Sequence, residues 1–277
     1  MISEKGRMRP KKGLGQHFLA DLRVAQRIAE AAGGGPGDLV VEIGPGRGAL
    51  TSFLLRRVGT VVGVELDRGL CEALSSRFAS EAGFHLVHAD ALRVDFGALV
   101  RRHGIRDAVV VGNLPYYIAT PLILRLVSGR WGLRKAVVTV QREVARRIVA
   151  DPGNKNYGAL SIAVQVAATP RRLFDVGRDA FRPVPRVEST VLEIDLGCPA
   201  IPVAEAVRRT FIEVVRWTFG HRRKMLRGTL RTLPGRPLGA SQMDEVASLS
   251  GLDLRRRPET FTIGEFERLA EVIQQIA

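Results

Sequence analysis

The stretch VGNLPYYIATP (111–121) follows a β-branched run and holds residues suited to hydrogen bonding and stacking. Asn113 offers a side-chain amide, Leu114 a main-chain carbonyl and Tyr116 an aromatic face. Because Pro115 fixes its own φ, it would hold the preceding carbonyl in one direction. The stretch carries no charged side chain, histidine or cysteine. It is therefore suited to orienting a planar polar group, although a plain proline-containing turn has the same composition.

A glycine-rich segment, VVEIGPGRGALT (40–51), places Gly44, Gly46 and Gly48 between an expected strand and an expected helix. Glycines there allow a sharp turn and a close approach of the backbone to a ligand at the helix N-terminus. The spacing is not the G-x-G-x-x-G of dinucleotide binders, and no phosphate-loop lysine motif follows. The segment thus favours another nucleotide cofactor, or a turn required by sterics alone.

Two acids follow the next two expected strands. Glu65 comes 21 residues after Gly44, where an acid accepts hydrogen bonds from ribose hydroxyls. Asp90 in HADAL (88–92) could accept from an adenine amino group, although a helix N-cap is the simpler interpretation. With Asn113, these residues all fall at carboxyl ends of expected strands, where open α/β sheets bind ligands.

The elements that must position these residues alternate along the first two thirds of the chain. Strands are expected at 39–43, 61–65, 85–89, 108–112 and 136–140, and helices near 48–57, 68–80, 120–128 and 142–150. Such alternation predicts an α/β fold with a parallel sheet. The segments 157–168, 171–176 and 190–196 are expected to finish that sheet.

Two prolines and a glycine in GCPAIP (197–202) indicate a linker. We therefore predict one domain over 1–197, with a basic N-terminal motif at 1–20, and a small helical, arginine-rich domain over 198–277.

The net charge of +14 is concentrated in two segments. Residues 208–236 hold nine Arg or Lys and one acid, and residues 1–12 hold five and one. Such clustering favours a polyanionic partner, with general solubility as the alternative. The predicted contacts to nucleic acid are Lys11, Lys12, Arg222, Arg223, Lys224 and Arg227. The last four fall in a stretch predicted to be helical, with few acids nearby in the sequence.

Cys71 and Cys198 are too few for a disulfide framework or a metal site, which favours the cytoplasm and predicts no metal. No run is long and apolar enough for a membrane helix. No oligomerisation surface is evident, so a monomer is expected.

The chain resembles the KsgA-type ribosomal RNA adenine dimethyltransferases, which are Rossmann-like enzymes that use S-adenosylmethionine. The residues that carry the resemblance are KKGLGQHFL (11–19), VEIGPGRGALT (41–51), VELD (64–67), HADAL (88–92), NLPYY (113–117), FRPVPRVEST (181–190) and HRRKMLRGTL (221–230). The resemblance assigns cofactor contacts to His17, Leu19, Gly44, Gly46, Glu65, Asp90 and Asn113. Many family members carry asparagine where this chain has His17.

The resemblance also implies the chemistry of the NLPY stretch. The amino nitrogen of adenine is a poor nucleophile, because its lone pair delocalises into the ring. If Asn113 and the Leu114 carbonyl accept its two N–H bonds, the lone pair can point at the sulfonium methyl. Tyr116 would stack on the base, and Phe181 would cover its other face. No general base is needed, because the methylated amino group sheds its proton readily.

The implied reaction is dimethylation of two adjacent adenosines near the 3′ end of small-subunit rRNA, within an assembling 30S-type subunit. Two alternatives remain open at this point: an Erm-type methyltransferase acting on large-subunit rRNA, and a binding protein of ribosome assembly or transcription with little activity. Physical reasoning alone also leaves DNA open as a substrate.

Overall fold

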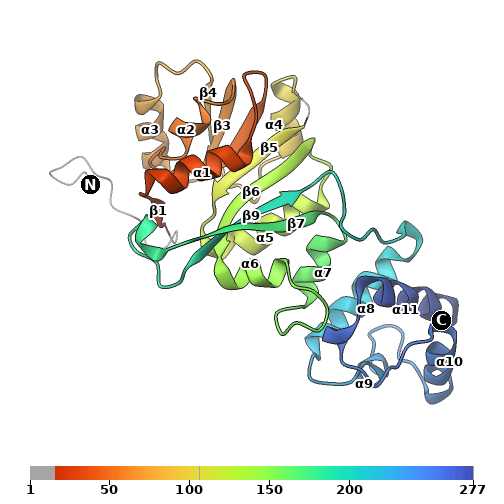
Figure 1. Cartoon of the computed structure of the whole chain (residues 1–277). Helices are drawn as coiled ribbons and strands as arrows, with labels where there is room; N and C mark the ends of the chain where they lie inside the picture. Colours follow the sequence, from red (N-terminus) through yellow and green to blue (C-terminus); the bar gives the residue numbers. More distant parts are fainter. Residues whose placement is uncertain (1–15, 106, 277) are drawn as a thin grey trace. The chain divides into compact units, whose positions relative to one another are not determined.

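The computed structural model describes residues 16–105 and 107–276, which form two compact units (Figure 1). The first unit takes the chain up to Ala145 and again Ala168–Cys198. The second takes Arg146–Ala167 and the chain from Pro199 onward. Each unit has its own cluster of buried apolar residues.

A seven-stranded sheet in the order β4-β3-β2-β5-β6-β9-β7 forms the centre of the first unit. The strands are β2 (Leu39–Ile43), β3 (Thr60–Glu65), β4 (Phe84–His88), β5 (Ala108–Asn113), β6 (Leu133–Gln141), β7 (Thr169–Val176) and β9 (Ser189–Asp195). β2 to β6 pair in parallel, whereas β9 pairs antiparallel with both β6 and β7. All five residues of β2 are buried, as expected for a strand covered on both faces.

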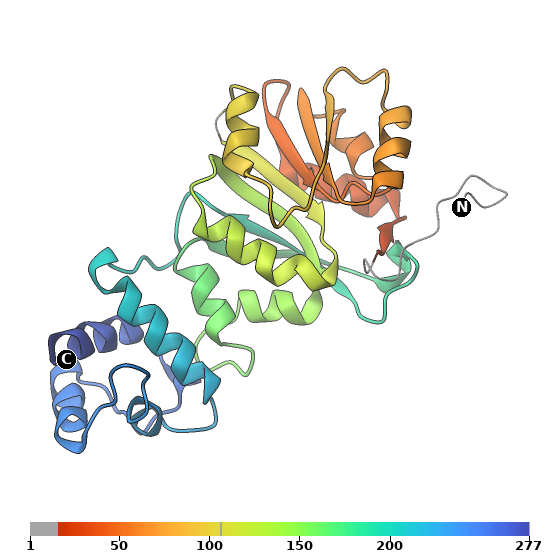
Figure 2. The same cartoon turned by 180° about the vertical axis from the view of Figure 1, so that it is seen from behind.

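Helices cover both faces of this sheet. They are α1 (Leu22–Ala32), α2 (Thr51–Leu54), α3 (Arg68–Arg77), α4 (Phe96–Arg102) and α5 (Tyr116–Ser128), followed by α6 (Arg142–Ile148) after β6. α1 lies in front of the sheet in Figure 1, and the reverse view in Figure 2 shows α4 and α5 on the opposite face. The buried side of α1, with Ala25, Ile28 and Ala29, packs on valines of the central strands.

Two short strands join distant parts of the sequence. β1 (Phe18–Leu19) pairs antiparallel with β8 (Phe181–Arg182), with Leu19 opposite Phe181. This pairing holds the segment around His17 beside the sheet, although it is far along the chain from β5.

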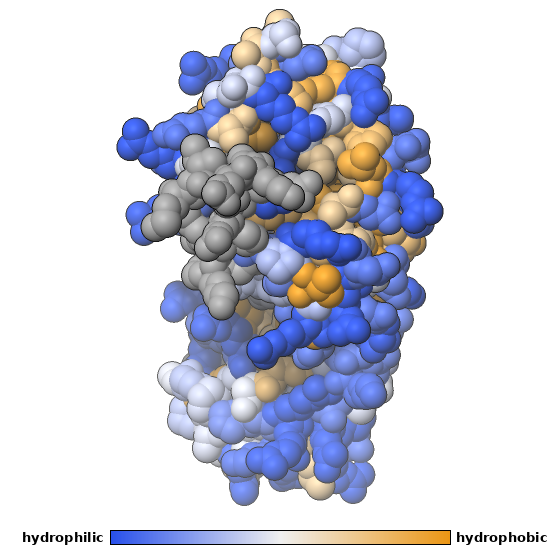
Figure 3. All heavy atoms as spheres, turned by 90° about the vertical axis from the view of Figure 1, so that its left-hand side faces the viewer, coloured by the Kyte–Doolittle hydropathy of each residue, from blue (hydrophilic) through white to orange (hydrophobic). Residues whose placement is uncertain are grey.

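The second unit is helical. It contains α7 (Ala159–Gln165), α8 (Arg208–Gly220), α9 (Leu226–Leu230), α10 (Ala240–Ser250) and α11 (Ile263–Ile276). Its apolar cluster joins Tyr157 and Ile162 to Phe211 on α8 and Phe266 on α11. Figure 3, which draws both units, shows hydrophilic side chains over much of one face, with groups of apolar side chains between them.

The structure confirms the α/β class and the five strands predicted at 39–43, 61–65, 85–89, 108–112 and 136–140. The sequence did not reveal α1, α4, β1 or β8. β9 runs antiparallel to both β6 and β7, so the sheet is mixed rather than parallel. α5 begins at Tyr116, four residues before the predicted start, since proline is well tolerated at a helix start.

The prediction that 157–168 belongs to the sheet is wrong. Residues 159–165 form α7, which starts where Ser161 Oγ accepts from Gly158 N–H at 3.0 Å. The β-branched residues that suggested a strand instead pack into the helical cluster, because tertiary packing overrides weak propensity. The chain consequently passes from the first unit to the second at 145/146 and returns to the first at 167/168. It passes to the second unit again at 198/199, beside the predicted linker.

Within residues 16–105 and 107–276, no helix is long and apolar enough to cross a membrane. The same residues contain no group of three or more His, Cys, Asp or Glu side chains placed to hold a metal ion.

Candidate active site

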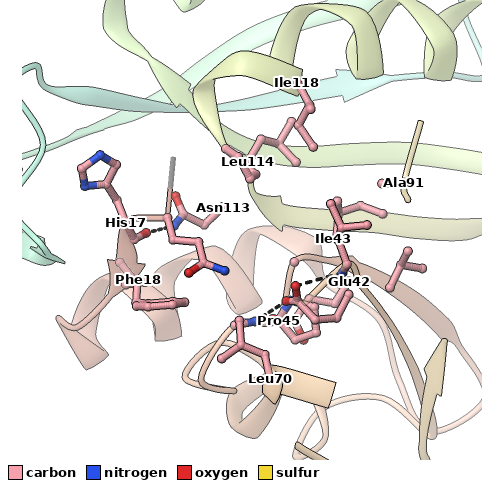
Figure 4. Close-up of a pocket in the computed structure, with 18 of the residues that line it drawn as sticks. His17, Phe18, Glu42, Ile43, Pro45, Leu70, Ala91, Asn113, Leu114 and Ile118 are labelled. Carbon is pink, nitrogen blue, oxygen red and sulfur yellow. Dashed lines mark hydrogen bonds between the residues drawn. The ribbon is translucent and has the colours of Figure 1, made fainter. Parts of the chain in front are cut away.

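A pocket opens in the first unit where β2 to β5 end (Figure 4). The strand order reverses here, since β2 has β3 on one side and β5 on the other, and such switch points bind ligands in open α/β sheets. The predicted residues that line it are His17, Leu19, Gly44, Gly46, Glu65, Asp90, Asn113, Leu114, Pro115 and Tyr116. Sequence reasoning missed Gln16, Glu42, Leu66 and Tyr117, which line it too.

The glycine loop needs its glycines for conformation and space. Gly44, Gly46 and Gly48 have φ of 64°, 59° and 75°, in the left-handed region that side chains disfavour. A Cβ on Gly46 would stand 2.9 Å from the Phe18 ring, whereas a Cβ on Gly44 would meet nothing within 4 Å. The loop therefore presents open space beside bare backbone at Gly44.

Glu65 ends β3 with its carboxylate surrounded by backbone N–H groups. Oε1 accepts from Leu66 and Asp67 at 2.9 Å each, and Oε2 accepts from Gly46 at 3.2 Å. Burial raises the pKa of Glu65, against the lowering effect of these three bonds. A carboxylate can accept about four hydrogen bonds, and Glu65 accepts three here, so a further donor can bind. The bond that such a donor would most easily replace is the longest one, from Gly46 N–H.

Glu42 is a second buried acid in the pocket wall. Its side chain on β2 is 2% exposed, and Oε2 accepts from the Thr51 hydroxyl at 2.6 Å. Burial, together with the charge of nearby Glu65, raises the pKa of Glu42 to about 8. The sequence signal for this residue is an acid within the apolar run LVVEI, because soluble proteins rarely bury an acidic side chain that has no partner.

Asp90 follows β4 at the edge of the pocket. Its Oδ1 accepts from Leu92 N–H at 2.9 Å within the turn that follows β4, and Oδ2 lies 3.8 Å from Arg93 Nε. Tyr117 also lines this pocket, with 55% of its surface exposed. No helix begins at Asp90, because residues 91–93 form a turn and the N-cap of α4 is Asp95, so the helix-cap interpretation of Asp90 is wrong, whereas its carboxylate does line the pocket.

Asn113 ends β5 with its amide held by the N-terminal segment. Nδ2 donates to the His17 carbonyl oxygen at 2.8 Å, a bond drawn in Figure 4. The amide oxygen is then the atom of Asn113 that remains to accept from a ligand. Leu114 is fixed too, because its N–H donates to Thr139 O at 3.1 Å.

Tyr116 is held at both its ring and its hydroxyl. Its OH lies 3.1 Å from Ser189 Oγ on β9, and the His17 ring stacks on it with centroids 5.7 Å apart. Phe181, for which a stacking role was predicted, is 1% exposed and packs in the apolar cluster with Leu19, and it is not among the residues that line the pocket. Its position in β8, paired with β1, turns its side chain into the core.

The sequence matches the family described as "Ribosomal RNA adenine dimethylase" over residues 7–270. The chain belongs to this family. As a ribosomal RNA adenine dimethylase it is an S-adenosylmethionine-dependent enzyme that methylates adenine in ribosomal RNA.

Similar proteins agree with this assignment. "Ribosomal RNA small subunit methyltransferase A" of Moorella thermoacetica is 41% identical over 281 residues, 99% of this chain and 96% of that protein. The protein of the same name from Pelotomaculum thermopropionicum is 42% identical over 269 residues, 95% of this chain and 90% of that protein.

Solved structures share the fold. A dimethyladenosine transferase from Plasmodium falciparum gives a TM-score of 0.73 at 23% identity, covering 91% of this chain and 96% of that chain. The 23S rRNA methyltransferase ErmE gives 0.71 at 23% identity, covering 93% and 100%. The dimethyladenosine transferase and the 23S rRNA methyltransferase thus both share the fold of this chain.

The dimethylase pocket offers hydrogen-bond acceptors and open space that fit S-adenosylmethionine. Glu65 presents a carboxylate for ribose hydroxyls, and the Asp90 carboxylate at the pocket edge suits an amino group. The open space at Gly44 lets a ligand approach the backbone closely. These three residues would hold the adenosine part of the cofactor.

Removing the Glu65 carboxylate should weaken cofactor binding at least tenfold. Glu65→Ala loses charge-assisted hydrogen bonds worth about 1.5–3 kcal/mol each. Calorimetry with S-adenosylmethionine measures the change. Glu72→Ala is the matched control, because Glu72 lies on α3 with its side chain 70% exposed. A folded Glu65→Ala protein with the wild-type affinity would remove Glu65 from the site.

The arginine-rich segment 221–227 of the dimethylase lies in the second unit, and its secondary structure differs from the predicted helix. Residues 221–224 form a turn rather than a helix, and α9 begins only at Leu226, so Arg223 and Arg227 share no helix face. Arg227 pairs with Asp244 at 2.9 Å, and Arg222 lies 3.9 Å from Glu259, acids that come later in the sequence. Arg223 and Lys224 are exposed. Lys11 and Lys12 lie outside the described residues.

Proposed function

We propose that this enzyme dimethylates the 6-amino groups of two adjacent adenosines near the 3′ end of small-subunit rRNA, in an assembling 30S-type subunit. The names of the relatives from Moorella and Pelotomaculum support the small subunit as the substrate. The observation that carries the proposed chemistry is the bond from Asn113 Nδ2 to the His17 carbonyl, because it leaves the amide oxygen to receive an amino group.

Asn113 and Leu114 act on the target amino group in this proposal. The amide oxygen of Asn113 and the carbonyl of Leu114 accept its two N–H bonds, so that its lone pair leaves the plane of the ring. Bound S-adenosylmethionine supplies an electrophilic sulfonium methyl group. The Tyr116 ring, held through Ser189, stacks on the base and fixes its plane. Rate enhancement then comes from positioning and hydrogen bonding, and the proton of the methylated amino group passes to water.

Mapping of the methylated nucleotides by mass spectrometry tests this function. The purified enzyme is incubated with labelled cofactor and either immature small subunits or large-subunit rRNA. We expect dimethyladenosine at two neighbouring positions of the small-subunit RNA and none in the large-subunit RNA. Label confined to large-subunit RNA would indicate an Erm-like specificity, and absence of label would indicate a binding role.

We further propose that the second unit contributes the RNA contact through Arg223 and Lys224, that the enzyme acts as a monomer, and that it works in the cytoplasm. The exposure of these two cations and the density of positive charge over 208–236 support the contact. Gel filtration with light scattering measures the oligomeric state.

Charge reversal at these two positions should weaken binding to small-subunit RNA and make its salt dependence shallower. For Arg223→Glu with Lys224→Glu, we expect the slope of log affinity against log salt to fall by roughly 0.7–0.9 per lost phosphate contact. Filter binding across a salt series measures it. Arg101→Glu with Arg102→Glu changes net charge equally, on the exposed end of α4, and serves as the control. Equal slopes for the two double variants would locate the RNA contact elsewhere.

A further inference from the structure

The pocket is lined by three acids and, among the residues that the structure describes, by one arginine or lysine. The acids are Glu42, Glu65 and Asp90, and the cation is Arg47 of the glycine loop. S-adenosylmethionine carries both signs of charge, because its sulfonium and ammonium groups are positive and its carboxylate is negative. Acids suit the positive groups and the ribose hydroxyls, whereas a carboxylate needs a cation or an N–H donor. Arg47 is therefore the candidate partner for the carboxylate.

The Arg47 side chain lies against the N-terminal segment. Its guanidinium carbon is 4.8 Å from the centroid of the Phe18 ring, a cation–π contact. The same ring covers the glycine loop, since a Cβ on Gly46 would stand 2.9 Å from it. Phe18 is held in turn, because it belongs to β1, which pairs with β8. The Phe18 ring thus keeps the guanidinium beside the pocket, although Arg47 is exposed.

The order of the strands separates this end of the pocket from the end that suits adenosine. Asp90 and Glu65 follow β4 and β3, whereas Asn113 follows β5, on the other side of β2. Figure 4 shows Ala91, the neighbour of Asp90, on the opposite side of the pocket from Phe18. An adenosine held by Asp90 and Glu65 therefore leaves the Phe18 side to another part of the cofactor.

The sulfonium determines which part that is. Its sulfur carries three substituents, which are the ribose carbon, the methyl group and the chain that ends in the amino acid. In the proposed function Glu65 holds the ribose and the methyl group faces Asn113. The third substituent then extends along the remaining wall of the pocket, which the N-terminal segment and the glycine loop form and where Arg47 lies.

We propose that Arg47 makes the pocket specific for cofactors with an intact amino-acid part, because its guanidinium binds the carboxylate of S-adenosylmethionine. The proposal rests on the proposed function, which directs the methyl group at Asn113. A guanidinium presents its N–H groups in a planar fork that matches a carboxylate with two parallel bonds. An arginine that lies over an aromatic ring can still donate from the edge of this plane, so the contact with Phe18 and the bonds to a carboxylate are compatible.

Two ligands that differ only in the carboxylate test the proposal without RNA. Decarboxylated S-adenosylmethionine keeps the adenosine, the sulfonium and the amino group. Calorimetry with the full-length protein at low salt, where exposed charges are least screened, gives the dissociation constant of each ligand. We expect the wild type to bind S-adenosylmethionine about three- to tenfold more tightly than the decarboxylated ligand. This range is that of a charge-assisted pair weakened by solvent, because Arg47 is exposed.

Substitution of Arg47 should remove this preference. For Arg47→Gln, we expect the affinity for S-adenosylmethionine to fall about three- to tenfold and the affinity for the decarboxylated ligand not to fall. Arg47→Lys keeps the charge without the planar fork and should retain part of the preference. Arg56→Gln is the matched control and should bind both ligands as the wild type does. Arg56 is also exposed and lies 4.7 Å from the centroid of a phenylalanine ring, that of Phe53, but it does not line the pocket.

Three results would overturn the proposal. If the wild type binds both ligands equally, no cation of the pocket binds the carboxylate. If Arg47→Gln weakens both ligands equally, Arg47 only supports the glycine loop and Phe18. If Arg47→Gln keeps both cofactor affinities and loses affinity for small-subunit RNA, its partner is an RNA phosphate. None of the calorimetric measurements involves a target adenine, so failure of the proposed function appears separately, as an Asn113→Ala variant that methylates at the wild-type rate.

Discussion

Asn113→Ala should lower the single-turnover rate of methyl transfer by about 10²–10³-fold. Removing one positioned hydrogen-bonding group that acts where charge develops has effects of this size in enzymes. Here the target nitrogen becomes positive as it gains a methyl group, so an amide oxygen that accepts its N–H bond holds it more strongly at that moment. The rate is measured on immature small subunits at saturating cofactor and RNA.

Asn156→Ala provides the matched control for this variant. Asn156 is one of the three asparagines of the chain and lies in the second unit, where its own N–H bonds to Asn154 Oδ1. RNA affinity should change little in Asn113→Ala, because most of it comes from phosphate contacts. Saturating cofactor in the assay keeps any loss of cofactor affinity, which the pocket position of Asn113 allows, out of the measured rate. A rate within threefold of wild type would exclude Asn113 from the chemistry.

The pocket residues at the carboxyl ends of the strands could be predicted from the sequence. Gly44, Glu65, Asp90 and Asn113 each follow a run of apolar residues, and parallel strands bring their carboxyl ends to one edge of a sheet. Only the order of the strands was needed to bring them together. Right-handed crossovers and the usual adjacency of consecutive strands leave few possible orders for an alternating α/β chain.

The other half depends on contacts between distant segments, which local patterns do not contain. His17 reaches Asn113, 96 residues away, only because two-residue strands pair β1 with β8. The same pairing buries Phe181. Arg222 and Arg227 meet acids that lie 37 and 17 residues further along the chain, which the count of neighbouring acids did not consider.

The second large effect is expected at Glu42, whose ionisation makes the free energy of unfolding depend on pH. Its pKa is about 8 in the folded protein and near the ordinary value of 4.5 in the unfolded chain. Between these values the unfolded chain has released the proton that the folded state keeps. The contribution of Glu42 is therefore fully present below pH 4.5 and is lost as pH rises toward 8. Each pKa unit corresponds to about 1.4 kcal/mol, so the rise of the Glu42 pKa from 4.5 to about 8 corresponds to a loss of about 5 kcal/mol.

Glu42→Gln should remove this dependence, since the amide stays neutral at every pH and can still accept from the Thr51 hydroxyl. We expect the variant and the wild type to have similar free energies of unfolding near pH 4.5. Near pH 8.5 the variant should be the more stable by about 5 kcal/mol. Urea unfolding across this range measures the difference. Glu72→Gln, on the exposed surface of α3, should leave the wild-type pH profile unchanged. Parallel profiles for wild type and Glu42→Gln would mean that the Glu42 carboxyl is ionised in the folded protein at neutral pH.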